Sequence, residues 1–106
     1  LSQEEKYSIR YHVIVLAESV GGICVHVATE DFRREPLSYS ECFKMLEDKG
    51  VFDCAKDLIG IMRLRNLLVH RYWTIEDSQV YDSIKKNFRG VHKFLGSMKR
   101  KYGINL

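Results

Sequence analysis

Hydrophobic residues recur at alternating spacings of three and four along most of this chain, which is the spacing of one face of an α-helix. The first such segment extends from about Ser8 to Phe32. Its apolar positions are Ile9, Val13, Leu16, Val20, Ile23 and Val27. Gly21-Gly22 lies inside it and fits either a close helix–helix contact, with a dimer partner as one candidate, or a tolerated kink. Pro36 ends the segment because the residue before a proline avoids the α region.

Capping signals predict a short second helix. Ser38 and Glu41 stand at the spacing of a capping box, in which the first side chain accepts a hydrogen bond from the backbone of the second. Gly50 is well placed as a C-terminal cap. We therefore expect a helix from about Ser40 to Lys49.

A central and a final helix follow. Asp53 is a suitable N-cap for the central helix, and no Gly or Pro interrupts the chain from Ile61 to Trp73. Thr74 and Asp77 form a second capping-box-like pair before the final helix. That helix extends down to Gly103, and its apolar repeat is Val80, Ile84, Phe88 or Val91, Leu95, Met98 and Tyr102.

These elements define the fold class. No stretch has a convincing β-strand pattern, and the chain contains no repeats, linkers or low-complexity tracts. Its 106 residues give room for one modest core. The sequence therefore predicts a single all-α domain over residues 1–106, an antiparallel four-helix up-and-down bundle.

Composition and charge narrow the class of protein. The hydrophobic fraction of 45% is ordinary for a folded domain, and the net charge of +3 permits an RNA partner without arguing for one. Cys24, Cys42 and Cys54 are odd in number and include no CxxC pair, which favours reduced thiols in a cytoplasmic protein. The apolar run from Val13 to Ala17 is too short to span a bilayer and there is no signal peptide, so we expect no membrane association.

The usual signatures of cofactor-dependent and metal-dependent enzymes are missing. The sequence has no GxxxxGK[ST], GxGxxG, GxSxG or HExxH motif. The histidines are scattered without metal-ligand spacing, at His12, His26, His70 and His92. We expect neither a metal nor a cofactor.

The central helix combines aliphatic residues with the densest set of chemically active side chains. At about 100° per residue, Arg63, Asn66 and His70 fall within a stripe roughly 60° wide on one side of that helix. Arg65 projects toward an apolar side, where a charge is costly unless an anion or an interface receives it. Glu18 is one conceivable internal partner for Arg65.

These residue types suit cleavage of RNA without a metal. Such a reaction needs a base for the 2′-hydroxyl proton, an acid for the leaving oxygen and positive charge at the phosphate. Imidazole, with an unperturbed pKa of about 6.5, suits the proton transfers, and guanidinium matches two phosphate oxygens. One His70 per chain cannot easily be both acid and base, whereas two chains could supply both. On the residues alone, a single histidine near arginines is more often structural than catalytic.

The motif in the central helix resembles that of a known family. Residues 65–72 read R-N-x-x-V-H-x-Y, which closely resembles the R-x4-H-x-Y signature of the HEPN superfamily in its HepT-like toxin branch. Pro36 through Phe43, with Leu46 and Gly50, resemble that family's P-x-S-Y-x-E-x-F-x-x-L-x-x-x-G segment. Residues 73–84 resemble its W-x-I-x-x-x-x-V-Y-x-x-I continuation, so the likeness covers most of the chain.

The resemblance implies a homodimer with two copies of the motif at a shared cleft, acting on RNA as a metal-independent ribonuclease toxin of a toxin–antitoxin pair. Arg65 and His70 would be the catalytic pair, with Asn66 as a positioning polar group and Arg63 on the same stripe as support. The family's antitoxin is a small nucleotidyltransferase, MntA, which attaches AMP to the motif tyrosine, here Tyr72. Anionic nucleotides at that position would repel an RNA phosphate.

Two questions stay open at the level of sequence. On an ideal helix Arg65 and His70 are about 140° apart, so one chain would not direct both side chains at one phosphate. Either the helix is distorted near the motif, or the site combines residues of two chains across a dimer interface, and we predict the second. The alternative function is a non-catalytic helical module that docks a nucleotidyltransferase partner or its nucleotide substrate.

Overall fold

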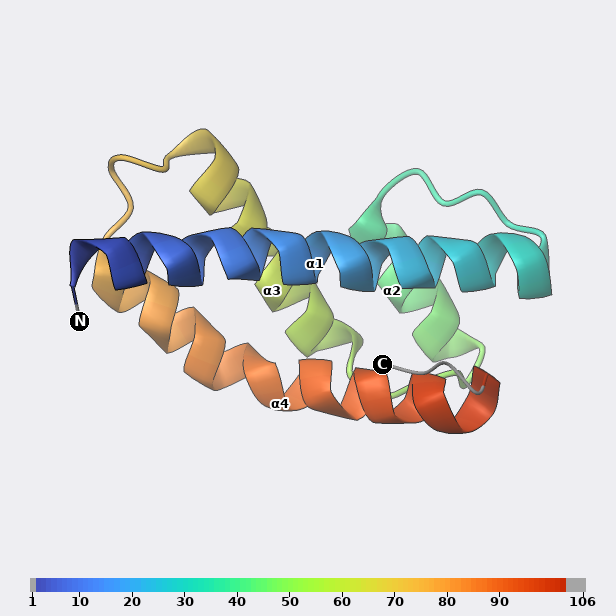
Figure 1. The fold of residues 1–106 in the computed structure, drawn as a ribbon. Coiled ribbons are helices and arrows are strands. Elements are labelled where there is room, and N and C mark those ends of the chain that lie inside the picture. The colour runs from blue at the N-terminus through green and yellow to red at the C-terminus, as the bar shows by residue number, and fades with distance from the viewer. Residues whose placement is uncertain (1, 103–106) are drawn as a thin grey trace.

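The computed structural model describes residues 2–102, and within them the chain forms four α-helices and no strand (Figure 1). The helices are α1 (Gln3–Phe32), α2 (Tyr39–Asp48), α3 (Ala55–His70) and α4 (Asp77–Tyr102). The predicted all-α four-helix fold is therefore confirmed. Gly103, where we expected the last helix to end, lies outside the described residues.

α1 begins earlier than its apolar repeat indicated. The Ser2 side chain accepts a hydrogen bond from the Glu5 backbone, and the Glu5 side chain accepts one from the Ser2 backbone, which together make a capping box. The helix ends at Phe32, and Arg33 follows in the left-handed conformation with φ of 51°. Its backbone N–H bonds to the Ala28 carbonyl, which caps the end of the helix.

The two adjacent glycines inside α1 have different surroundings. A Cβ on Gly21 would lie 2.7 Å from the ring of Tyr39, whereas a Cβ on Gly22 would meet nothing within 4 Å. Figure 1 shows α1 as one continuous straight helix. The close-contact interpretation is therefore confirmed for Gly21, inside the chain against the first residue of α2, and the kink is wrong.

The caps of α2 follow the prediction. Ser38 is the N-cap and accepts a hydrogen bond from the Glu41 backbone at 3.1 Å. At the other end Gly50 has φ of 76°, and its N–H bonds to the Glu47 carbonyl while the Val51 N–H bonds to the Leu46 carbonyl. This pair of bonds is a Schellman motif, which needs a left-handed residue and so favours glycine.

Three boundary predictions around α3 and α4 are wrong. Cys54 rather than Asp53 precedes α3, and a carboxylate from α2, that of Glu47, accepts the first free N–H of the helix. α3 ends at His70 and not at Trp73. Thr74 does not cap α4, since its hydroxyl faces a carbonyl in its own turn. The predicted Thr74–Asp77 capping pair does not form because side chains of α1 bind the Asp77 carboxylate instead.

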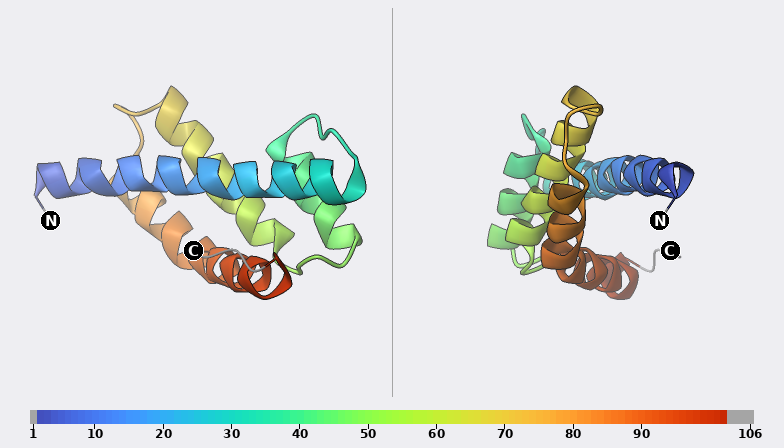
Figure 2. Two further views of the ribbon diagram at one scale, coloured as in Figure 1. Left: turned by 45° about the vertical axis from the view of Figure 1, so that its right-hand side comes forward. Right: turned by 90° about the vertical axis from the view of Figure 1, so that its left-hand side faces the viewer.

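α2 and α3 lie side by side and inclined to α1, which passes across both of them (Figure 2). The main core lies among all four helices and contains the fully buried side chains of Phe43, Leu46, Leu58, Ile61, Phe94 and Met98. A smaller cluster lies where α3 ends and α4 begins, and it consists of Val13, Leu64, Leu68, Ile75 and Val80. The second cluster anchors the end of α3 that carries the motif.

Among the described residues α1 is long and apolar enough to cross a membrane by length and composition alone. Our prediction considered only the short run Val13–Ala17 and so missed this property. The same helix contributes Val13, Ala17, Val20, Cys24 and Val27 to the core. A core helix of a folded domain has this composition for that reason.

Candidate functional site

The last turns of α3 present one polar face to solvent. Leu64 and Leu68 point inward into the small core cluster, so the opposite face of the helix points outward. On that face Arg63, Asn66 and His70 are all exposed. They line an open hollow of about 480 Å³, completed by Leu67 and Arg71. The predicted stripe therefore exists as a surface, although the chemical roles of its members stay predictions.

The hollow is positively charged. Arg63 and Arg71 each bring a guanidinium that remains charged at any physiological pH, and His70 lies between them in sequence. One guanidinium group can bind two phosphate oxygens at once, and imidazole is the side chain that most often transfers protons in catalysis. Asn66 adds an amide that both donates and accepts hydrogen bonds. The arrangement suits a phosphodiester.

Asn66 lies where two hollows meet. Besides the hollow next to His70, it lines a second one of about 400 Å³ together with Met62 and residues 36–40 at the start of α2. An extended polymeric ligand bound along α3 has room to continue from the hollow next to His70 toward the start of α2.

Arg65 lies on another side of the helix, as its angle predicted, and does not line the hollow next to His70. Its guanidinium pairs with the Glu18 carboxylate of α1 at 2.9 Å and donates to the Asn66 side-chain oxygen at 2.9 Å. Its Nε is buried without a hydrogen-bond partner among the described residues. Glu18 thus receives this charge inside the chain, as the internal alternative foresaw. Arg65 therefore gives no support of its own to an interface, and the dimer interface stays a prediction.

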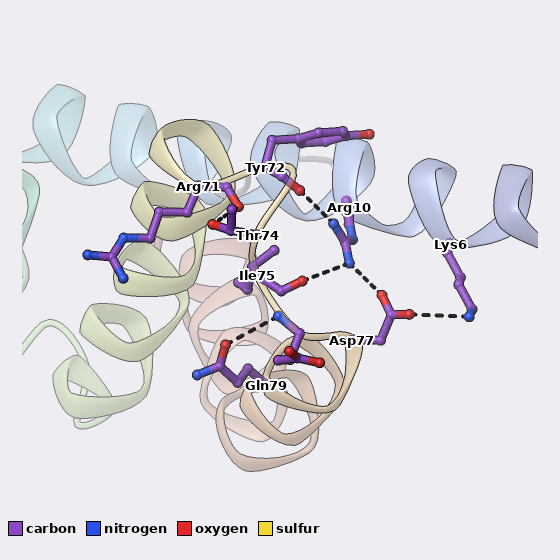
Figure 3. A network of polar contacts seen from close by, with 9 residues as sticks. Lys6, Arg10, Arg71, Tyr72, Thr74, Ile75, Asp77 and Gln79 are labelled. Carbon is purple, nitrogen blue, oxygen red and sulfur yellow. Dashed lines mark hydrogen bonds and ion pairs between the residues drawn. The ribbon is translucent and has the colours of Figure 1, made fainter.

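Tyr72 follows the end of α3, in the connection between α3 and α4 that forms an arch in Figure 1. Its ring is stacked on Tyr7 of α1, with centroids 5.6 Å apart, and the guanidinium of Arg10 lies 5.7 Å from its centroid. Figure 3 shows the Tyr72 ring and the Arg71 side chain on opposite sides of this connection. The tyrosine hydroxyl and the hollow at His70 are therefore near each other in sequence but face different directions.

Sequence reasoning missed the residue that holds this connection in place. Arg10 of α1 is only 7% exposed, and its guanidinium donates to the backbone carbonyls of Tyr72 at 2.9 Å and Ile75 at 3.4 Å (Figure 3). It also pairs with the Asp77 carboxylate, which in turn pairs with Lys6 at 3.2 Å. The hydrogen bond from Arg10 and the pair with Lys6 hold the pKa of Asp77 below its usual range.

A signal for Arg10 existed in the sequence. The buried face of α1 contains Val13, Ala17, Val20 and Cys24, and Arg10 continues that spacing one turn earlier. A charged residue in register with a buried face requires a partner, so its position alone indicated a buried ion pair.

In the part of the chain that the structure describes, the cysteines and acidic residues do not gather into a metal site. Within residues 2–102 no group of three or more His, Cys, Asp or Glu side chains could hold a metal ion. Cys24, Cys42 and Cys54 are free and buried in the main core. Burial raises the pKa of Cys54 to about 11, so this thiol stays protonated at neutral pH.

One of three comparisons with known proteins found a match, and it agrees with the family that the motif resembles. The sequence model of the family described as "Ribonuclease HepT-like" matches residues 2–98, nearly the whole chain. Comparison with curated proteins found no match, and comparison with solved structures found none. Because the match includes all of α1, α2 and α3 and most of α4, the chain belongs to the HepT-like ribonuclease family.

Proposed function

We propose that this protein is a metal-independent endoribonuclease toxin whose active site is built around His70. The observation that supports this most strongly is the open hollow in which an imidazole, an amide and two guanidinium groups lie together. Arg63 and Arg71 would bind the oxygens of the scissile phosphate, and Asn66 would orient the ribose or the phosphate.

The chemistry is an internal transfer at phosphorus. One imidazole takes the proton of the 2′-hydroxyl, and the 2′-oxygen forms a bond to the phosphorus. The bond from phosphorus to the 5′-oxygen breaks, and an imidazolium gives that oxygen a proton. The products are a 2′,3′-cyclic phosphate and a 5′-hydroxyl. The two proton transfers need a base and an acid at the same time, one on each side of the phosphate.

We propose that a homodimer supplies both, with His70 of each chain at a shared cleft. Two exposed aliphatic side chains support an interface at this end of α3: Leu67, which lines the hollow, is 40% exposed, and Val69, on another side of the helix, is 47% exposed. Apolar side chains left exposed next to a polar site are found on surfaces that a partner covers. A symmetric pair of these surfaces would bring the two histidines toward one another.

We propose Arg65 as the second catalytic residue, with the role of binding the phosphate. Its pair with Glu18 is partly exposed, with side-chain accessibilities of 27% and 48%, and such a pair contributes only about 0–1 kcal/mol. Because Arg65 and His70 of one chain face different sides of α3, a phosphate in the shared cleft would displace Glu18 and bind the Arg65 fork of one chain while it lies beside His70 of the other. Until then, the hydrogen bond from Arg65 holds the Asn66 side chain in place.

We further propose that a nucleotidyltransferase antitoxin of the MntA type neutralises the toxin in the cytoplasm by attaching AMP to Tyr72. The support is positional, since Tyr72 follows His70 by two residues and its connection is fixed to α1. The Tyr72 hydroxyl faces away from the hollow, so the added phosphates would act by repelling the backbone of RNA that extends past the cleft across the connection. Incubation with such an enzyme and ATP should increase the mass of the protein by AMP units, and Tyr72→Phe should prevent the increase.

The direct test is digestion of total RNA by the purified protein with a chelator present. We expect cleavage by the wild type, loss of cleavage in His70→Ala, and full activity in His92→Ala, whose exposed histidine lies on α4. Cleavage that disappears with the chelator, or persists in His70→Ala, would contradict the proposal. An absence of cleavage with tight binding of a nucleotidyltransferase would instead support the non-catalytic module.

A further inference from the structure

Three aromatic side chains gather beside the motif. Tyr7 of α1 stacks on Tyr72, and Trp73 meets both rings edge-on, with centroid separations of 6.0 Å to Tyr7 and 5.0 Å to Tyr72. Trp73 is nevertheless 80% exposed. The largest aromatic side chain of the protein is therefore positioned by its neighbours while its own surface faces solvent.

The cluster is held in one geometry. Arg10 fixes the backbone at Tyr72 through a hydrogen bond of 2.9 Å and lies over the ring of the same residue. The backbone N–H groups of Thr74 and Ile75 both bond to the Arg71 carbonyl, which closes the turn. A side chain presented on a fixed turn loses little conformational freedom when it binds a ligand.

We propose that Tyr7, Tyr72 and Trp73 form a stacking platform for an unpaired base of single-stranded RNA. This proposal rests on the proposed ribonuclease function. Single-stranded nucleic acids bind where aromatic rings lie beside cationic groups, because every base has a face that can stack. The cations here are Arg71 on one side of the connection and, on the other, Arg10 and Lys6, which share the single carboxylate of Asp77 and so leave one net positive charge.

The platform binds a base at a distance from the cleaved bond. Figure 3 shows Arg71 and Tyr72 on opposite sides of the connection, so a strand whose phosphate lies in the hollow must cross the connection to reach the rings. The base on Trp73 therefore lies outside the two nucleotides that flank the scissile phosphate. It contributes to the affinity for longer RNA and not to the cleavage of a dinucleotide.

Trp73 is the only tryptophan in the chain, so its fluorescence reports on this site alone. We would titrate the protein with a single-stranded 2′-O-methyl oligonucleotide, which lacks the nucleophilic hydroxyl and cannot be cleaved. We expect saturable quenching that weakens as salt increases. Trp73→Ala should weaken binding, measured by anisotropy of a labelled oligonucleotide, by roughly 5- to 100-fold, and Trp73→Phe should weaken it less.

The matched control is Tyr11→Ala. Tyr11 is a 63% exposed aromatic on the same helix as Tyr7, and its ring lies edge-on to the ring of His12, with centroids 5.7 Å apart. It should leave the affinity for the oligonucleotide unchanged. In cleavage assays Trp73→Ala should raise KM for a long substrate while kcat/KM for a dinucleotide stays at the wild-type value.

The outcomes separate this proposal from the ribonuclease proposal. Cleavage without quenching, or equal affinities of wild type and Trp73→Ala, overturns the platform alone. Quenching without cleavage overturns the nuclease and leaves the platform standing. If the fluorescence instead changes with protein concentration in the absence of RNA, and Trp73→Ala weakens self-association, the surface is an interface between two copies and the platform is wrong.

Discussion

Arg10→Met should detach the connection between α3 and α4 from α1. Methionine keeps much of the buried apolar stem but removes every donor of the guanidinium. The carbonyls of Tyr72 and Ile75 then lose their charged hydrogen-bond partner. The change therefore isolates the polar part of the contact that holds Tyr72 next to the motif.

The size of the effect follows from these two carbonyls. A buried acceptor left without a partner costs about 1–3 kcal/mol, and the Ile75 bond is buried whereas the Tyr72 bond is partly open to water. We therefore expect a loss of about 3 kcal/mol in the free energy of unfolding. For a domain of this size that is a fall in Tm of about 12 °C.

Urea unfolding followed by circular dichroism measures the loss, and hydrogen exchange locates it. The amides of Thr74 and Ile75 bond to the Arg71 carbonyl. Their exchange should be faster in the variant than in the wild type, and this increase should be larger than the increase for amides in the middle of α3. Lys6→Met is the matched control, because it removes only a partly exposed ion pair and should leave Tm nearly unchanged. Equal stabilities for the two variants, or unchanged exchange at the connection, would refute this account of Arg10.

Three further predictions concern the helices and the motif. Gly22→Ala should stabilise the protein by about 0.5–1 kcal/mol because the surroundings of Gly22 are open. Gly21→Ala should destabilise it by about 1 kcal/mol because the new methyl group meets the ring of Tyr39. Thermal melts should therefore show a higher Tm for the first variant and a lower Tm for the second. The lowered pKa of Asp77 means that its contribution to stability is present above the unfolded pKa of about 3.9 and is lost as the pH falls through the lower folded value. The difference in urea midpoint between wild type and Asp77→Asn should therefore be constant near neutral pH and vanish in strong acid; a difference that persists there would contradict the assignment. Glu18→Gln should leave RNA cleavage intact or increase it if Arg65 acts directly on the phosphate, and a loss comparable to that of Arg65→Ala would show that the pair itself is required.

The elements that depend on local sequence could be predicted. Helical spacing predicted the first and last helices, and the run without Gly or Pro predicted the central one. Ser38 and Gly50 marked both ends of α2 because their capping bonds involve residues only a few positions away. The angular positions of Arg63, Asn66 and His70 likewise follow from one regular helix, and these residues do line one hollow.

The features that the sequence did not predict depend on residues far apart in the chain. Asp77 has the sequence signature of a helix cap, but Arg10, 67 residues earlier, binds its carboxylate. The same arginine holds the carbonyl of Tyr72, in a turn where uninterrupted helix-forming residues had suggested more helix. Glu18 was foreseen as one internal partner of Arg65, but only the packing of α1 on α3 could decide between it and an interface.

The most direct test of the central claim, that two copies of His70 act together at one cleft, is a mixing experiment. Wild-type protein is mixed with increasing amounts of His70→Ala, the chains are allowed to exchange, and RNA cleavage is measured with saturating substrate and a chelator. If both histidines of a dimer are needed, activity per wild-type chain should fall to about half in an equal mixture and to about one tenth at a ninefold excess of the variant. Mixing with active His92→Ala should cause no such fall. Activity per wild-type chain that stays constant at a ninefold excess of His70→Ala would contradict the shared site.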